Sequence, residues 1–152
     1  MVVGGVVTRL YMPERMTEDL NILIFATDAA SLQQELTQGN CQQIGTLTVG
    51  GMSWKLPNHS LLDVLEADER WAREAIAQPV EEPTGLPTIA LPYLVLMKLQ
   101  ASRVQDLADI TRMLGAADEP MLQQVRTVIN NYMPDALEDI ESMVVLGRLE
   151  YE

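Results

Sequence analysis

The first half of the chain carries short hydrophobic segments with the period of a β-strand. The segment 20–25 is apolar on both faces, which is typical of a central strand. Residues 52–56 alternate between apolar and polar after the glycine pair at 50–51, so we expect a hairpin between 44–49 and 52–56 with a two-residue turn. Another apolar run predicts a strand over 61–65.

Helical spacing fills the intervals between these strands and then the rest of the chain. Two short extended pieces are expected at 2–3 and 86–89, and 78–86 is expected to be a loop because it contains two prolines. Capping residues and apolar spacing predict helices over 6–10, 28–37, 69–77, 92–101, 102–114, 121–132 and 136–149. In the helix over 102–114, which we expect to end at Gly115, the apolar stripe is Val104, Leu107, Ile110 and Leu114.

Length and charge limit the class of protein. With 152 residues, of which 47% are hydrophobic, the chain fits a single domain with its own core. It has no apolar run of about 20 residues and no secretory signal, so we expect a cytoplasmic protein without a membrane contact. A net charge of −12 argues against general nucleic-acid binding, yet it permits a basic partner or a small anionic ligand bound by a few local cations.

Cysteine and histidine are too scarce for several common kinds of site. The single cysteine, Cys41, excludes an internal disulfide and a cysteine-based zinc cluster. The single histidine, His59, lies in the segment 57–60, which resembles a surface turn, so a catalytic triad or a multi-histidine metal site is not expected.

Candidate chemistry begins where the first long strand begins. Asp19 and Asn21 are two residues apart, so they would point to the same side of the sheet and could bind a hard cation such as Mg²⁺ through oxygen. The alternative is ordinary turn chemistry before a strand. The pair Gly4-Gly5, between strand and helix, would let a phosphate approach the backbone, or it is a plain turn.

Five further charged residues lie within or beside apolar segments. Asp63 lies inside a hydrophobic strand and therefore needs a partner, which is a cation, water, arginine or a backbone amide. Lys98 is the one charge in a core-like helix and either snorkels to solvent or meets an anion. Arg103, Asp106 and Asp109 form a polar stripe that is either solvated or folded back toward Lys98.

Taken in order, these motifs resemble the polymerase-beta-type nucleotidyltransferase superfamily and, within it, the bacterial AbiEii-toxin-like minimal nucleotidyltransferases. The resemblance covers roughly residues 4–114. Its motifs are Gly4-Gly5, Arg15-x-Thr17-x-Asp19-x-Asn21, Leu62-Asp63-Val64, Lys98-x-x-Ala101-x-Arg103 and Asp106-Leu107-x-Asp109-Ile110.

This resemblance implies an α/β (α+β) fold: a mixed, twisted sheet of about four to five strands with helices packed on it. Residues 1–90 would form the nucleotidyltransferase-like core, and 91–152 a helical C-terminal part. It also implies transfer of a nucleoside monophosphate from NTP to a hydroxyl acceptor with Mg²⁺.

The resemblance also assigns residue roles. Asp19, Asp63 and Lys98 would be catalytic: the two carboxylates would hold the metal with Asn21, and Lys98 would meet phosphate. Nucleotide binding would involve Gly4, Gly5, Lys98, Asp106 and Asp109.

Two departures from the family pattern leave catalysis open. Asn21 stands where the family has a second carboxylate, and an amide binds Mg²⁺ without contributing a charge. The sequence also begins three residues before Gly4, without the helix and most of the strand that precede this turn in the family. The alternative is therefore a degenerate, non-catalytic module that acts through protein interaction, as a toxin–antitoxin-like partner or a homodimer.

Overall fold

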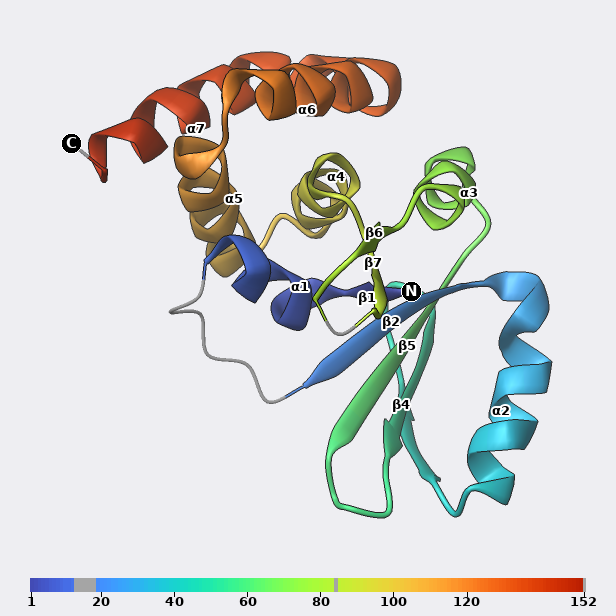
Figure 1. Cartoon of the computed structure of the whole chain (residues 1–152). Helices are drawn as coiled ribbons and strands as arrows, with labels where there is room; N and C mark the ends of the chain where they lie inside the picture. Colours follow the sequence, from blue (N-terminus) through green and yellow to red (C-terminus); the bar gives the residue numbers. More distant parts are fainter. Residues whose placement is uncertain (13–18, 84, 152) are drawn as a thin grey trace. The chain divides into compact units, whose positions relative to one another are not determined.

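The first part of the chain contains both strands and helices, and the described residues after β7 form only helices (Figure 1). A computed structural model describes residues 1–12, 19–83 and 85–151. The elements are β1 (Val2–Val3), α1 (Gly4–Tyr11), β2 (Leu20–Phe25), α2 (Ala29–Gln38), β3 (Gln42–Thr46), β4 (Gly51–Lys55), β5 (Leu61–Ala67), α3 (Arg70–Ala77), β6 (Val80–Glu81), β7 (Pro87–Thr88), α4 (Leu91–Ala101), α5 (Val104–Ala116), α6 (Glu119–Tyr132) and α7 (Leu137–Leu149).

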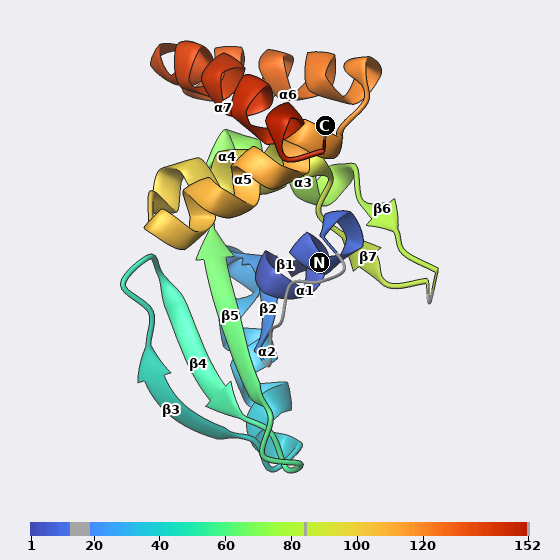
Figure 2. The same cartoon turned by 90° about the vertical axis from the view of Figure 1, so that its left-hand side faces the viewer.

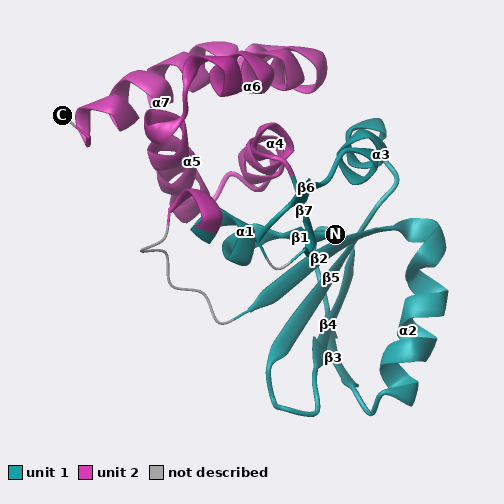
Figure 3. Cartoon of the chain, in the orientation of Figure 1, with its two compact units in different colours: residues 1–9, 15–89 teal, residues 10–14, 90–152 magenta. Residues whose placement is uncertain are grey.

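The chain folds into two compact units (Figure 3). Unit 1 comprises residues 1–9 and 15–89, and unit 2 comprises residues 10–14 and 90–152. The β-sheet of the described residues belongs to unit 1, whereas α4 to α7 belong to unit 2. None of the described helices is long and apolar enough to cross a membrane.

A mixed sheet organises unit 1 (Figure 2). In the described residues it has seven strands in the order β3-β4-β5-β2-β1-β7-β6, with β2 parallel to β5 and β1 parallel to β7. The predicted mixed sheet is confirmed, and β2 lies at its centre as expected. The four to five strands implied by the resemblance are too few. The short pieces expected at 2–3 and 86–89 pair into the same sheet as β1 and β7, and β6 adds a two-residue strand within the expected loop.

One face of this sheet is covered by α2. Trp54, Leu62 and Val64 form the buried centre of this layer, and Leu32 and Leu36 of α2 pack against them. The even-numbered residues of β2 pack against the same cluster. Because side chains alternate along a strand, the residues between these apolar positions lie on the opposite face of the sheet.

The hairpin of β3 and β4 forms as an antiparallel pair, but its turn is longer than predicted. Residues 47–50 connect the strands, and the Leu47 amide donates to the Gly51 carbonyl at 2.9 Å. Gly51 is already part of β4, with φ +116°, and a Cβ there would lie 1.9 Å from the Val64 carbonyl oxygen. The second glycine therefore serves the close approach of β5 rather than the turn.

In unit 2, α5 packs against both α4 and α7. The prediction that α5 ends at Gly115 is wrong, because the helix continues to Ala116. A Cβ at Gly115 would lie 2.3 Å from the carbonyl carbon of Gly147, so glycine here permits a close helix crossing. Ile110 and Leu114 are buried as the apolar stripe predicted, but Val104 at the start of the helix is 87% exposed.

Candidate functional site

Polar side chains line up across the sheet of unit 1, on the face opposite α2. Asn21 of β2 is the register partner of Asp63 in the parallel strand β5, and Asp63 is the partner of Ser53 in β4. The Ser53 hydroxyl donates a hydrogen bond of 2.6 Å to Oδ1 of Asp63. An amide, a carboxylate and a hydroxyl thus occupy three neighbouring strands on one face.

Asp19 lies at the edge of the same face, two residues before Asn21. It is exposed and lines a cavity of about 720 Å³. The other described lining residues come from β3, from the end of β4, from the turn after it and from the start of β5: Ile44, Lys55, Asn58, His59, Ser60 and Leu61. His59 is exposed in that turn, as the sequence predicted. The motif residues Arg15 and Thr17 lie outside the described residues.

Gly4 adjoins Asn21 at the start of α1. It has φ +68°, and a Cβ there would lie 2.7 Å from Nδ2 of Asn21, so a side chain would collide with the amide. Val3 of β1 pairs with Asn21, and α1 begins at the next residue. The first turn of α1 therefore lies beside Asn21, at the end of the row formed by Ser53, Asp63 and Asn21. Gly4 and Gly5 thus form the first turn of the helix rather than a separate turn before it.

The oxygen atoms on this face suit a hard cation. Asp19 and Asp63 contribute carboxylates, and Asn21 contributes an amide oxygen that is not among the three atoms nearest Gly4. In the described ranges, no group of three or more histidine, cysteine, aspartate or glutamate residues forms a potential metal site. The two carboxylates and the amide on this face are oxygen donors of the kind that Mg²⁺ prefers.

The other predicted site residues belong to unit 2 and form a buried ionic cluster. Nζ of Lys98 lies 3.0 Å from Oδ1 of Asp106 and 2.8 Å from Oδ2 of Asp109. Arg103 adds a contact of 2.6 Å from Nε to Oδ2 of Asp106. The interpretation that this polar stripe faces Lys98 is therefore confirmed. Lys98 itself is buried and does not extend to solvent.

The electrostatics of this cluster keep Asp106 ionised. Burial raises the pKa of Asp106, but hydrogen bonds and charges from Arg103 and Lys98 outweigh burial and leave the pKa below its ordinary value. The same hydrogen bond and the charge of Asp106 raise the pKa of Arg103. Asp106 and Arg103 therefore form an ion pair that keeps both charges at neutral pH.

Sequence reasoning missed three residues near Asp19 and Asp63. Alternation places Ser53 on the polar side of its strand, and only the register between β4 and β5 identifies Asp63 as its partner. Lys55 has the same alternation signal as Ser53, whereas His59 reaches the cavity through the turn and gives no periodic signal.

Comparison with known proteins identifies the fold. No protein-family model and no curated protein matches the chain. The crystal structure of ANT(2'')-Ia in complex with adenylyl-2''-tobramycin matches with a TM-score of 0.53 at 12% identity, over 99% of this chain and 87% of that one. The solution structure of the antibiotic-resistance factor ANT(2'')-Ia matches with a TM-score of 0.50 at 15% identity, over 99% and 82%. The chain has a nucleotidyltransferase fold.

A nucleotidyltransferase fold is what the resemblance implied, whereas membership of the superfamily and of its AbiEii-like branch stays a prediction. A weaker likeness, to the Thermotoga maritima CCA-adding enzyme complexed with tRNA, has a TM-score of 0.39 at 10% identity, over 95% of this chain and 46% of that one. At identities this low, structural likeness establishes the nucleotidyltransferase fold and leaves the reaction to be argued from the site.

Proposed function

We propose that this chain is a nucleotidyltransferase of the AbiEii-like branch, acting in the cytoplasm on NTP and a hydroxyl acceptor. The observation that carries the proposal is the pairing of Asn21 with Asp63 in adjacent parallel strands, with Asp19 two residues ahead. These oxygen donors stand on one face of a nucleotidyltransferase fold, beside the first turn of α1. Backbone N–H groups at a helix N-terminus favour anions, which suits the phosphates of NTP.

The reaction is a group transfer at the α-phosphorus of NTP. The acceptor oxygen forms a bond to this phosphorus, the bond to the bridging oxygen breaks, and pyrophosphate leaves with the bonding electrons. The hydroxyl proton passes to a carboxylate, for which Asp63 is the candidate because Ser53 fixes its orientation.

Magnesium would be held by Asp19, Asn21 and Asp63. When bound, Mg²⁺ supplies charge neutralisation for the triphosphate and lowers the cost of forming the attacking oxyanion. Two carboxylates and an amide provide one negative charge fewer than three carboxylates, so we expect weaker metal binding than in a three-carboxylate site.

Lys98, Asp106 and Asp109 are assigned to nucleotide binding by resemblance. The ammonium of Lys98 already contacts both carboxylates, at 3.0 and 2.8 Å. A contact of Lys98 with phosphate would therefore require it to share or exchange one of these partners. A role in holding α4 to α5 requires no such change.

A calorimetric titration of Mg²⁺-ATP and Mg²⁺-GTP tests the proposal. We expect micromolar binding to the wild type and its loss in Asp19→Ala. Asp28→Ala is the matched control, because Asp28 is an exposed aspartate of unit 1 whose side chain makes no cap hydrogen bond. Absence of binding to the wild type, or equal binding to both variants, would contradict the proposal.

Asn21 and the surface of α7 favour a second candidate function, a non-catalytic interaction module. Val145, Leu146 and Leu149 of α7 are each more than half exposed, which provides an apolar surface for a protein partner or a second copy. On this alternative we expect no binding of Mg²⁺-NTP. We also expect light scattering to detect a complex or dimer that Leu146→Glu dissociates. A monomer that binds Mg²⁺-NTP would contradict it.

A further inference from the structure

The cavity beside Asp19 contains a lysine on the same face as the candidate metal ligands. Lys55 lies two residues after Ser53 in β4, so its side chain points to the face that carries Asp63. The cavity of about 720 Å³ has the size of a small-molecule site. Lys55 and Asp19 thus lie on opposite sides of β5. Gly4 follows β1, so it lies on the other side of Asp63 from Lys55.

Within residues 1–12, 19–83 and 85–151, Lys55 forms no ion pair with a carboxylate, which is unusual in this acidic protein. Among the described basic side chains of both units, all except Lys55 and Arg9 form ion pairs with aspartate or glutamate. Arg9 is exposed on α1 and does not line the cavity. Asp19 lines the same cavity and is assigned to the metal in the proposed function, so the ammonium of Lys55 is the charged group of the described lining that can meet an anion.

The turn beside Lys55 is held by hydrogen bonds that fix the rim of the cavity. The Leu56 amide donates to the Ser60 carbonyl, and the His59 amide donates to the Leu56 carbonyl, both at 2.9 Å. The Ser60 amide donates to Oδ1 of Asn58 at 3.1 Å, and His59 adopts φ +69°. His59 and Ser60 therefore bring an imidazole and a hydroxyl to the cavity from a defined turn, and both can donate hydrogen bonds to an anion.

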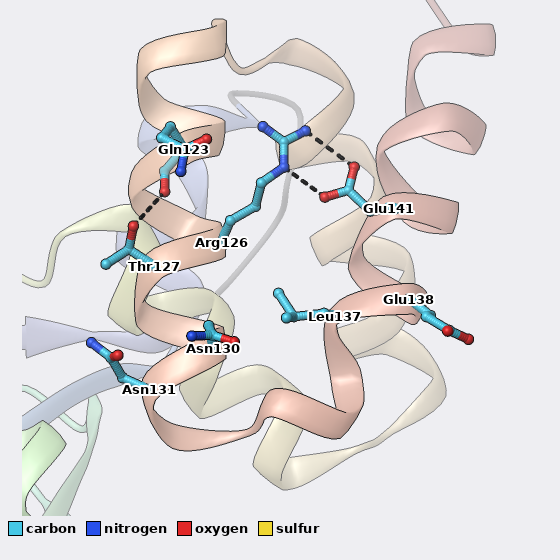
Figure 4. A pocket seen from close by; sticks show the side chains of 8 residues that line it. All are labelled: Gln123, Arg126, Thr127, Asn130, Asn131, Leu137, Glu138 and Glu141. Atoms are coloured by element: carbon cyan, nitrogen blue, oxygen red, sulfur yellow. Dashed lines mark hydrogen bonds and ion pairs between the residues drawn. The ribbon is translucent and has the colours of Figure 1, made fainter.

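A second cavity, in unit 2, shows the opposite arrangement (Figure 4). It has a volume of about 490 Å³ and lies between α6 and α7, with Arg126 in its lining. That guanidinium is already bound by Glu141, at 2.6 and 3.1 Å, and by Glu119. Its charge is neutralised, so it offers an anion much less than Lys55 does.

We propose that the cavity lined by Lys55, His59 and Ser60 binds an anionic group on the acceptor substrate. This inference rests on the proposed function, in which the nucleotide phosphates lie at the Gly4 side of the row Asn21–Asp63. The acceptor then approaches Asp63 from the side of β4, where Lys55 lies. The acceptor is a small hydroxyl compound with a phosphate or carboxylate, because a single lysine on an acidic protein does not hold a nucleic-acid backbone.

Binding of glycerol 3-phosphate, with glycerol as the matched neutral probe, tests this inference in the full chain by NMR titration. We expect glycerol 3-phosphate to shift the amide signals of residues 55–61 and glycerol to leave them unchanged. Lys55→Gln should weaken this binding about tenfold, the effect of losing a hydrogen bond to a charged group. Lys55→Arg should retain it. Arg9→Gln, which changes the other described basic residue outside the ion pairs, should bind like the wild type.

Titration of Mg²⁺-ATP into the same variants separates this inference from the proposed function. Unchanged nucleotide affinity in Lys55→Gln together with weaker glycerol 3-phosphate binding supports an acceptor subsite. Loss of nucleotide affinity in Lys55→Gln would overturn it, because the lysine would then bind NTP phosphate. Anion binding that is absent, or equal in wild type and Lys55→Gln, would overturn it even if Mg²⁺-ATP binds. Anion binding in a protein that never binds Mg²⁺-ATP would refute the acceptor role and the proposed function together.

Discussion

Asp63 accepts a hydrogen bond from Ser53 across the β4–β5 pair, with 2.6 Å between Oγ and Oδ1. This donor fixes the orientation of a half-buried carboxylate that we assign to the metal and the acceptor. We predict that Ser53→Ala weakens Mg²⁺-ATP binding by roughly threefold to tenfold and lowers the free energy of unfolding by about 1 kcal/mol. Calorimetry and urea denaturation measure the two effects. Ser53→Thr keeps the hydroxyl and should have the nucleotide affinity of the wild type. If Ser53→Ala is less stable but binds Mg²⁺-ATP as tightly as the wild type, the assignment of Asp63 to the metal is contradicted.

Asn21 offers a direct test of charge at the metal site. We predict that Asn21→Asp raises Mg²⁺ affinity by about tenfold or more, since it adds a negative charge beside Asp63. Without metal, the two adjacent carboxylates repel, so the free energy of unfolding should fall by up to about 1 kcal/mol and recover when Mg²⁺ is added. Titration followed by thermal unfolding with and without Mg²⁺ measures both. An affinity identical to that of the wild type would show that this face binds no metal.

Strand alternation and the family resemblance were enough to predict Asp19, Asn21 and Asp63 as site residues. Alternation placed Asp19 and Asn21 on one side of their strand, and the structure adds Asp63 beside Asn21 through the parallel register of β2 and β5. Register between strands distant in sequence depends on packing of the whole sheet, so neither Ser53 as a partner nor Lys55 as a cavity residue was visible beforehand.

The fold followed the sequence best where periodic segments were long. The strand over 20–25 has the predicted bounds, whereas the two-residue strand β6 lay in an expected loop. Gly115 was misjudged because glycine both ends helices and permits close helix contacts, and only the neighbouring helix distinguishes these uses. Lys98 likewise had two interpretations until α5 brought Asp106 and Asp109 to its ammonium.

The ionic cluster of Asp106 predicts a specific response to acid. Its pKa in the folded protein lies below the ordinary 3.8, because hydrogen bonds and charges from Arg103 and Lys98 outweigh the effect of burial. A lowered pKa contributes stability above pH 3.8, and this contribution disappears as the pH falls through the lower folded value.

We therefore predict that Asp106→Asn is less stable than the wild type at pH 7 by about 3 kcal/mol, since Lys98 loses a buried partner. The difference should shrink below about pH 4, where protonation removes the same charge from the wild type. Urea denaturation of both proteins from pH 2.5 to 7 measures it. Exposed Asp135→Asn is the control; a constant difference across this range would show that Asp106 is not held below its ordinary pKa.

The contact of Gly115 with Gly147 predicts that α5 and α7 tolerate no side chain where they cross. A Cβ at Gly115 would lie 2.3 Å from the carbonyl carbon of Gly147, and a Cβ at Gly147 would lie 2.0 Å from the carbonyl oxygen of Thr111. Both neighbours are backbone atoms, so the helices must separate to accept alanine. We predict that Gly115→Ala and Gly147→Ala each lower the free energy of unfolding by about 2–3 kcal/mol despite the higher helix propensity of alanine. Gly45→Ala is the control, since nothing lies within 4 Å of its Cβ position. Alanine variants at the crossing that unfold at the same urea concentration as the wild type would show that α7 is not held against α5 in solution.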